Sequence, residues 1–586
     1  MFFSRLLNPT RLLSVLLLLG LLSACGQTAG PSPRYAIVRF ENLSGDPSLE
    51  WVGFGASDFL SRSLQTAMDG PVLSPDAIGR SSQALGVHSA SAPGISAQRT
   101  SAMVAGANRV ISGYVERSPG GVRITASEEN VVTHRSLLTL SASAASSYEA
   151  LKLLAKKFSD KAGAPATTNE EALRLYCLSL EGTATDAPLL LERAVALDPA
   201  FGRAWLGLVR TLMATGDRAR AVSVIEQARA QKLAPVDRAN LDFEEAGLEN
   251  DRAASLAALR KMYTLSAGDN DLGRSLAQAE TAGGNFREAA AVWKKLTVDT
   301  PADTNAWNQL GYTLCWGGDY AGALAAIRHY ATLRPNDSNP LDSEGDIHYW
   351  FGKFSLAASS YLAAHARSSA FLEGGGLYKA AWAKFRAGDK TGAETLFGQF
   401  RDLREKAGDH SVVLFAGDWL YRTGRPQEAI ALLRDAAAKK SGPNDAAISA
   451  VAAIQLTVWD LLAGDRAAAA KDAATLGNAG LTPAALLARF ATLPSASAGE
   501  WDARATHLLA APQLAALRES ALGYALIFDD KKQAAIPVWE RIVKQSAGND
   551  FFSRAVLARL KGQAAEHVML PDAVNLNEFA AVPDKL

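Results

Sequence analysis

The chain lacks the short motifs that mark most catalytic and metal-binding sites. It contains no Walker A loop, no His-Glu-x-x-His, no Gly-x-Ser-x-Gly and no Cys-x-x-Cys. Only three cysteines and eight histidines occur among its 586 residues, and the histidines are scattered along the chain. We therefore predict that the protein is not an enzyme and has no catalytic residue, metal or cofactor.

The chain also has no excess of charge of either sign. The 60 basic residues balance the 60 acidic residues, so the formal net charge is zero. Non-specific nucleic-acid binding depends on a basic surface that displaces counterions, so we expect no nucleic-acid partner. After residue 24 we expect no segment that is long and apolar enough to span a bilayer, which takes roughly 20 residues.

The first residues are typical of a targeting segment. Arg5 and Arg11 flank the start of a short apolar run, 12–22, which leads into Leu-Ser-Ala and then Cys25. This order resembles a bacterial lipoprotein signal. The resemblance implies that residues 1–24 are removed, that Cys25 carries the lipid and that residues 25–33 form a tether. Gly26 after the cysteine favours the outer membrane, facing the periplasm.

Residues 34–163 mix strand and helix patterns. We expect strands over 35–40, 109–116, 121–126 and 135–141, and helices near 51–64, 97–107 and 148–161. The segment 37–47, Ile-Val-Arg-Phe-Glu-Asn-Leu-Ser-Gly-Asp-Pro, resembles the opening of the TolB amino-terminal-like domain. That resemblance implies a small α/β domain, which often precedes helical repeats.

A 34-residue period dominates the rest of the chain. We call the recurring position of this period a rung. Glycine occupies it at Gly182, Gly216, Gly284, Gly318 and Gly352, and asparagine occupies it at Asn250. A small residue follows each rung after five positions, and a large apolar residue follows after nine. A fixed period of this length predicts an array of identical helical hairpins. Cys177 and Cys315 are about four repeats apart, too far for a disulfide, so we expect both to be small buried residues.

The clearest unit runs from residue 304 to residue 337. It carries Trp307, Leu310, Gly311, Leu314, Gly318, Ala323, Ile327 and Pro335. This pattern resembles the tetratricopeptide repeat family. The resemblance implies a mainly α fold: a superhelix of roughly nine or ten hairpins over 169–545, preceded by the α/β domain and the signal peptide. A capping segment or tail would follow over 546–586.

The same resemblance implies a concave groove lined by the first helix of each hairpin. Most of the side chains assigned to it are aromatic or polar, and Asp418 and Arg422 accompany the last of them. The assigned residues are Asn305, Asn308, Tyr312, Trp316, Asp342, Asp346, Tyr349, Trp350, Tyr378, Trp382, Arg386 and Tyr421. Upstream, Arg203 and Arg210 occupy matching positions and could grip a carboxylate. The alternative is that some rings, such as those of Trp316 and Tyr349, pack between helices.

These patterns favour a lipid-anchored adaptor of the bacterial envelope that holds a protein or peptide in its groove. Two other functions stay open. Stacked Trp and Tyr with Asn and Asp would also suit a carbohydrate or peptidoglycan receptor. An enzyme with a site in the α/β domain is less favoured, because no catalytic constellation is present.

Overall fold

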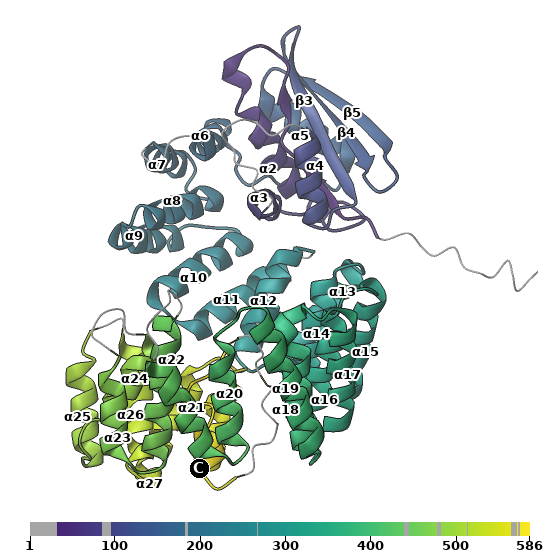
Figure 1. Cartoon of the computed structure of the whole chain (residues 1–586). Coiled ribbons are helices and arrows are strands. Elements are labelled where there is room, and N and C mark those ends of the chain that lie inside the picture. Colours follow the sequence, from purple (N-terminus) through teal and green to yellow (C-terminus); the bar gives the residue numbers. More distant parts are fainter. Residues whose placement is uncertain are drawn as a thin grey trace, which may run out of the picture. The chain divides into compact units, whose positions relative to one another are not determined.

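The computed structural model of the chain describes residues 32–84, 95–181, 186–266, 268–438, 445–476, 482–511, 514–563, 571 and 575–586. The expected signal peptide, Cys25 and the first rung, Gly182, lie outside these residues. The chain divides into two compact units, residues 1–276 and 277–586 (Figure 1).

Unit 1 begins with an α/β domain. Its sheet has the order β1-β3-β4-β5, with β2 also paired to β3. β1 and β2 run parallel to β3, whereas the other neighbours are antiparallel. The strands are β1 (Tyr35–Ile37), β2 (Glu41–Asn42), β3 (Arg109–Ser118), β4 (Gly121–Asn130) and β5 (Arg135–Ala144), and the helices are α2 (Val52–Leu64), α3 (Pro75–Ala84), α4 (Ile95–Val104) and α5 (Ser147–Phe158).

Helices cover both faces of this sheet. Ile111 of β3 packs in one apolar cluster with Phe59 of α2 and Leu151 of α5. Its neighbour Val110 belongs to a second cluster, with residues of α3 and α4. Successive strand residues point to opposite faces, so the two clusters lie on opposite sides. The expected strands and helices are confirmed, although β1 ends at Ile37 and does not reach residue 40.

Helical hairpins make up the rest of both units. In unit 1 they are α6 (Glu170–Glu181), α7 (Ala187–Leu197), α8 (Gly202–Ala214), α9 (Arg218–Arg229), α10 (Pro235–Glu249) and α11 (Arg252–Leu265), and the unit boundary falls within α12 (Asn270–Ala282). Unit 2 continues with α13 (Phe286–Asp299), α14 (Thr304–Trp316), α15 (Tyr320–Leu333), α16 (Asn339–Trp350), α17 (Phe354–Arg367), α18 (Gly375–Arg386), α19 (Lys390–Lys406), α20 (Val412–Arg422), α21 (Pro426–Ala438), α22 (Asp445–Leu462), α23 (Arg466–Ala474), α24 (Pro483–Ala491), α25 (Ala498–Leu508), α26 (Ala515–Phe528), α27 (Lys532–Gln545), α28 (Phe551–Leu560) and α29 (Val582–Lys585).

The periodic positions have the expected structural roles. Gly318 ends α14 with a left-handed φ of 86°, and Asn250 takes the same conformation, at 61°, after α10. Asn is one of the few non-glycine residues that tolerate this region. A Cβ on Gly311 would lie 2.6 Å from Cδ1 of Ile327, so glycine is needed where α14 crosses α15. The prediction of a tetratricopeptide-type helical solenoid preceded by a small α/β domain is confirmed.

The expectations for cysteine and for apolar segments have different outcomes. Cys177 and Cys315 are buried free thiols, as expected. The expectation about membrane spans needs a correction, because α22 is long and apolar enough by composition, with a mean hydropathy of 1.4 over 18 residues. α22 nevertheless packs against α21, α23 and α24, and it buries Gln455, Thr457 and Asp460. This pattern is that of a core helix.

Candidate partner-binding surfaces

The residues assigned to the groove of unit 2 lie on one side of α14, α16, α18 and α20, which we call the first-helix face. Most of them are covered. The buried ones are Asp342, Asp346, Tyr349, Trp350, Tyr378, Trp382 and Tyr421; Asn308, Tyr312 and Trp316 are half-buried, and Asn305 and Arg386 are exposed. The expectation that these rings face solvent is therefore wrong for Tyr349, Trp350, Tyr378, Trp382 and Tyr421. Whether they contact a partner stays a prediction.

Helix α28 covers the part of this face near α14 and α16. Phe551, at the start of α28, lies 4.4 Å from the ring centroid of Trp350 and 5.9 Å from that of Trp316. It also lies 6.4 Å from the ring of Phe286 on α13. Burying aromatic rings against one another removes the cost of exposing them to water, which explains why these positions are aromatic.

Residues 575–586, which we call the C-terminal segment, cover the part near α18 and α20. Leu576 packs against the apolar cluster that contains Tyr378 and Trp382. Phe579 is only 4% exposed and lies 4.4 Å from the ring of Tyr524 on α26. The segment therefore contacts the first-helix face and the last hairpin of the unit together.

A charged contact completes this cover. Nε of Arg422 donates to Oδ2 of Asp584 at 2.7 Å, and its Nη1 donates to Oδ2 of Asp418 at 3.2 Å. The guanidinium also lies over the ring of Trp382, at 4.6 Å. Burial alone would lower the pKa of Arg422, but the carboxylates of Asp418 and Asp584 raise it. Arg422 is thus a fixed positive charge that holds a carboxylate of the C-terminal segment.

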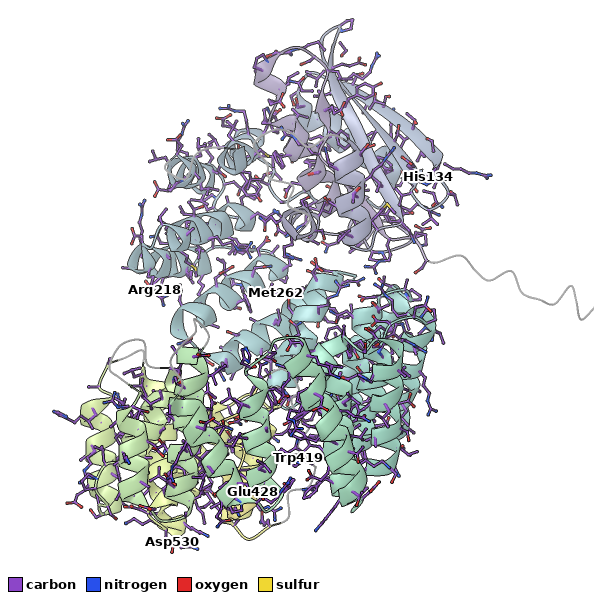
Figure 2. The ribbon with its side chains drawn as sticks, in the orientation of Figure 1. His134, Arg218, Met262, Trp419, Glu428 and Asp530 are labelled. Atoms are coloured by element: carbon purple, nitrogen blue, oxygen red, sulfur yellow. The ribbon has the colours of Figure 1, made fainter. Side chains whose placement is uncertain are left out.

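A cavity remains between the segment and the repeats. It has a volume of about 210 Å³ and is lined by Tyr349, Tyr378, Trp382, Asp418 and Arg422 on one side and by residues 571, 575–577 and 580 on the other. Behind it, Trp419 (labelled in Figure 2) stacks on Phe397 at 4.6 Å, with 4° between the ring planes. Trp419 in turn packs against Trp382, which lines the cavity.

A buried polar cluster lies further along the first-helix face. Nζ of Lys379, in α18, lies 2.8 Å from Oδ2 of Asp342 and 2.7 Å from Oδ1 of Asp346, both in α16. The hydroxyl groups of Tyr361 and Tyr312 donate to Asp346 at 2.8 and 2.7 Å. One cation therefore serves two carboxylates, and two phenols donate to Asp346, whereas the buried Oδ1 of Asp342 accepts no hydrogen bond from the described residues.

The electrostatics of this cluster follow from its burial. Burial, together with the nearby charge of Asp346, raises the pKa of Asp342 to about 6. Burial alone would lower the pKa of Lys379, but the carboxylates of Asp346 and Asp342 raise it. Lys379 therefore stays charged. The sequence analysis missed Lys379, although a lone lysine in an apolar stretch between Tyr378 and Trp382 was a usable signal.

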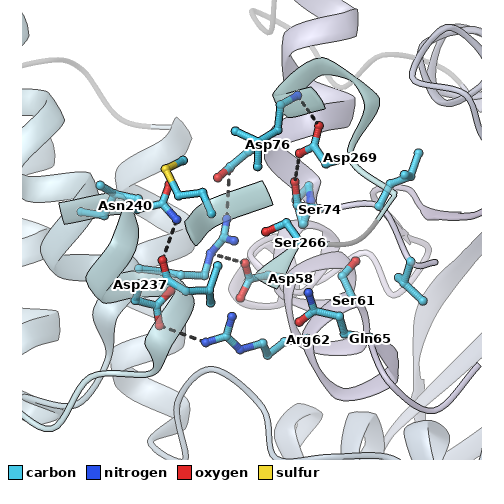
Figure 3. Close-up of a pocket in the computed structure, with 18 of the residues that line it drawn as sticks. Asp58, Ser61, Arg62, Gln65, Ser74, Asp76, Asp237, Asn240, Ser266 and Asp269 are labelled. Carbon is cyan, nitrogen blue, oxygen red and sulfur yellow. Dashed lines mark hydrogen bonds and ion pairs between the residues drawn. The ribbon is translucent and has the colours of Figure 1, made fainter. Parts of the chain in front are cut away.

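The two arginines assigned to the groove of unit 1 border a charged cavity of about 110 Å³ between the α/β domain and the repeats. Figure 3 shows acidic and polar side chains of α2, such as Asp58 and Ser61, facing Asp237 and Asp269 of the repeat region across this cavity. Arg62 of α2 donates to Asp237 of α10 at 3.0 Å. The cavity is therefore lined by ion pairs that join the two parts of unit 1.

Arg203 is already occupied by carboxylates of the chain. Its Nε lies 2.7 Å from Asp58 and its Nη2 lies 3.1 Å from Asp76, both in the α/β domain. Arg203 lowers the pKa of Asp76, whereas burial raises the pKa of Asp58. Arg210 is exposed and pairs with Glu244 at 2.7 Å. The predicted carboxylate grip is thus filled from within the chain, at Asp58, Asp76 and Glu244.

Comparisons with known proteins agree with the repeat geometry. Residues 178–237, within the span from α6 to α10, match the family model of the tetratricopeptide repeat. This segment is therefore similar to tetratricopeptide repeats. No curated protein matches the chain.

Several solved structures are similar to parts of the chain. The structure of the MamA protein is 15% identical to this chain, and the match covers 30% of this chain and 95% of the MamA chain, with a TM-score of 0.26. YrrB, described as a TPR protein with an unusual peptide-binding site, is 16% identical and covers 30% of this chain and 91% of its own, with a TM-score of 0.25. Yeast Tom70 is 12% identical and covers 67% of this chain and 90% of its own, with a TM-score of 0.30.

Proposed function

We propose that the chain is a protein-binding scaffold of the bacterial envelope, tethered by a lipid on Cys25, that holds a protein or peptide segment on the first-helix face of unit 2. The observation that carries the binding role is the C-terminal segment itself. Residues 575–586 do not belong to a helical hairpin, yet they lie on this face and are held by apolar contacts and one ion pair. Stacked helical repeats present extended surfaces of this kind to their ligands.

The buried rings argue against the carbohydrate alternative. Stacking on a sugar requires an open ring face, but Trp382 is 5% exposed and lies 4.7 Å from Trp419 and 4.6 Å from Arg422. Tyr421 stacks on Trp459 at 4.3 Å. The packing of these rings therefore favours protein binding over sugar binding.

Site-specific crosslinking in cells tests the binding role. A photoreactive residue at the exposed positions 305 and 386 samples the first-helix face, and one at Val298 or Leu356, which are exposed on second helices, serves as the matched control. We expect one protein to be crosslinked from the first two positions and not from the controls. Equal crosslinking from all four positions, or none, contradicts the proposal.

The tether has its own test. The signal-like residues before Cys25 support a lipid anchor, and mass spectrometry of the mature N-terminus measures it directly. We expect an acylated Cys25 and a membrane-bound protein, and we expect Cys25→Ser to move the protein to the soluble fraction. An unmodified Cys25 refutes the envelope tether but leaves the binding role untouched.

A further inference from the structure

Arg422 is the positive charge of the first-helix face where the C-terminal segment covers it. Elsewhere on this face, Lys379 is already paired with Asp342 and Asp346. The carboxylate that the repeats themselves supply to Arg422 is that of Asp418. Asp584 of the C-terminal segment supplies a second carboxylate to Arg422. A ligand for this face should therefore bring an acidic side chain.

The C-terminal segment also shows which apolar groups this surface accepts, because Leu576 lies against the aromatic cluster of the first-helix face and Phe579 lies against Tyr524 of α26. Phe579, Ala581 and Val582 are buried, and Leu576 is half-buried against the aromatic cluster. By contrast, Asn575, Asn577 and Asp584 are exposed. The contact therefore combines one large aromatic anchor, smaller apolar residues, a carboxylate on Arg422 and the ammonium group of Lys585 over the ring of Tyr421 at 5.4 Å. This combination suits a short protein segment.

The fit of the segment is incomplete, unlike that of a core element. A cavity of about 210 Å³ separates residues 575–577 from Tyr349, Tyr378 and Trp382. The Asp584 side chain keeps 41% of its surface exposed while it pairs with Arg422. A segment that leaves such a space beside aromatic rings gives up contact energy that a better-fitting ligand can recover.

We propose that the first-helix face of unit 2, together with α26, binds an acidic protein segment with an aromatic anchor, and that the C-terminal segment is an internal ligand that competes for this surface. This inference rests on the proposed function and names the chemistry of the partner. A partner must displace residues 575–586, so the binding-competent state is the one in which the segment has left. The apparent affinity of the intact chain for a partner is therefore the affinity of the open state multiplied by the fraction of molecules that are open.

An exchange experiment tests the proposal. A protease site inserted after Gln563 lets the full chain fold first and then leaves the following residues held only by non-covalent contacts. A labelled synthetic peptide with the sequence of residues 571–586 is then the probe, and fluorescence anisotropy follows its uptake. We expect the peptide to bind after cleavage and to bind the uncleaved chain at least tenfold more weakly, because the linked segment competes at high effective concentration.

Peptide variants identify the anchors. We expect Phe579→Ala in the peptide to weaken binding about thirtyfold, as for a buried aromatic anchor. Asp584→Asn should weaken it about fivefold, because that ion pair is partly exposed. In the protein, Arg422→Gln should remove the difference between the unsubstituted peptide and its Asp584→Asn variant. Arg425→Gln, which removes an arginine paired with Glu394 instead, should preserve that difference.

Hydrogen exchange of the uncleaved chain provides a second test, which remains valid if the cleaved protein fails to fold. We expect amides of residues 575–586 to exchange at least a hundredfold faster than those of α20, because the segment leaves without unfolding of the repeats. Exchange of both at the same rate would show a permanent core element and overturn the proposal. So would a folded, cleaved protein that takes up no peptide, or equal binding of the unsubstituted peptide and its Phe579→Ala variant.

These outcomes are separate from those of the proposed function. If crosslinking identifies a partner but the peptide never exchanges, the scaffold role stands and the competing internal ligand is refuted. If the peptide exchanges but no partner is found in cells, the chemistry of the face stands and the scaffold role fails.

Discussion

The two units fill the same repeat positions with different chemistry. In unit 1, first-helix residues such as Arg203 are charged and are neutralised by carboxylates of the α/β domain. In unit 2, first-helix residues such as Trp350 and Trp382 are aromatic and lie beneath α28 and the C-terminal segment. In both units, non-repeat chain covers the face that such repeats usually present to a partner. The difference is that a buried ion pair tolerates the loss of one member poorly, whereas an apolar contact weakens in proportion to the area that it loses.

Loss of Arg203 should have the largest effect. Arg203→Met leaves Asp58 buried without its cation, and breaking a buried pair costs about 3–5 kcal/mol. Hydrogen exchange of α2 and α8 measures this loss within unit 1, independently of unit 2. Arg210→Gln is the matched control, since its exposed pair with Glu244 contributes at most about 1 kcal/mol. Equal losses for the two variants would show that unit 1 does not depend on the buried pairs.

The apolar counterpart in unit 2 is Phe579. Phe579→Ala should weaken the contact of the C-terminal segment by about 2 kcal/mol, the free energy that corresponds to the thirtyfold loss expected for the peptide, because Phe579 is a buried aromatic anchor. Hydrogen exchange of α26 and of residues 575–586 measures the effect. Leu508→Ala, at a position 54% exposed in the same unit, should change stability by less than about 0.5 kcal/mol.

The helix crossings sharpen the comparison. In unit 2, Gly311 lies seven residues before Gly318, and in unit 1 the equivalent position before Gly216 is Val209. Gly311→Ala should destabilise unit 2 by about 1–2 kcal/mol, because the new Cβ would meet Ile327. Urea denaturation measures this loss, and adding Ile327→Val should restore part of it. Gly398→Ala, in a helix with open space around that position, should instead stabilise by about 0.5–1 kcal/mol.

The last effect concerns pH. The pKa of Asp342 is raised from 3.8 to about 6 in the folded chain, so the folded state binds more protons than the unfolded state between these values. The contribution of Asp342 to the free energy of unfolding therefore falls as pH rises from about 4 to about 6, and it is constant above that range. Asp342→Asn should remove this slope in urea titrations. Asp319→Asn, which retains a helix N-cap acceptor, should keep the slope of the original chain.

Local rules made much of the fold predictable. Gly318 and Asn250 each adopt a left-handed backbone conformation that few other residue types tolerate. Such a constraint concerns a single residue and recurs from hairpin to hairpin, so it is visible in the sequence. An aspartate after several rungs, as at Asp217 and Asp319, was a further signal that the sequence analysis left unused. These aspartates cap the second helix of their hairpins by accepting a backbone N–H three residues ahead.

The coverage of the first-helix faces was not predictable in the same way. Arg422 meets Asp584 across 162 residues, and Phe551 reaches Trp350 across a comparable separation. No periodicity links such positions, and a repeat pattern describes only contacts between neighbouring hairpins. The number of aromatic residues was nevertheless informative, since rings such as Trp382 and Tyr421 are costly to leave in water and imply a cover.

The position of the C-terminal segment in the sequence sets an order of events during synthesis. A ribosome makes residues 575–586 after every helix that they cover, and nascent chains generally fold from the N-terminal side. The hairpins from α14 to α20 must therefore form while Tyr378 and Trp382 are still open to the surroundings. A newly made molecule thus passes through an interval in which a chaperone or a binding partner reaches these rings without having to displace anything.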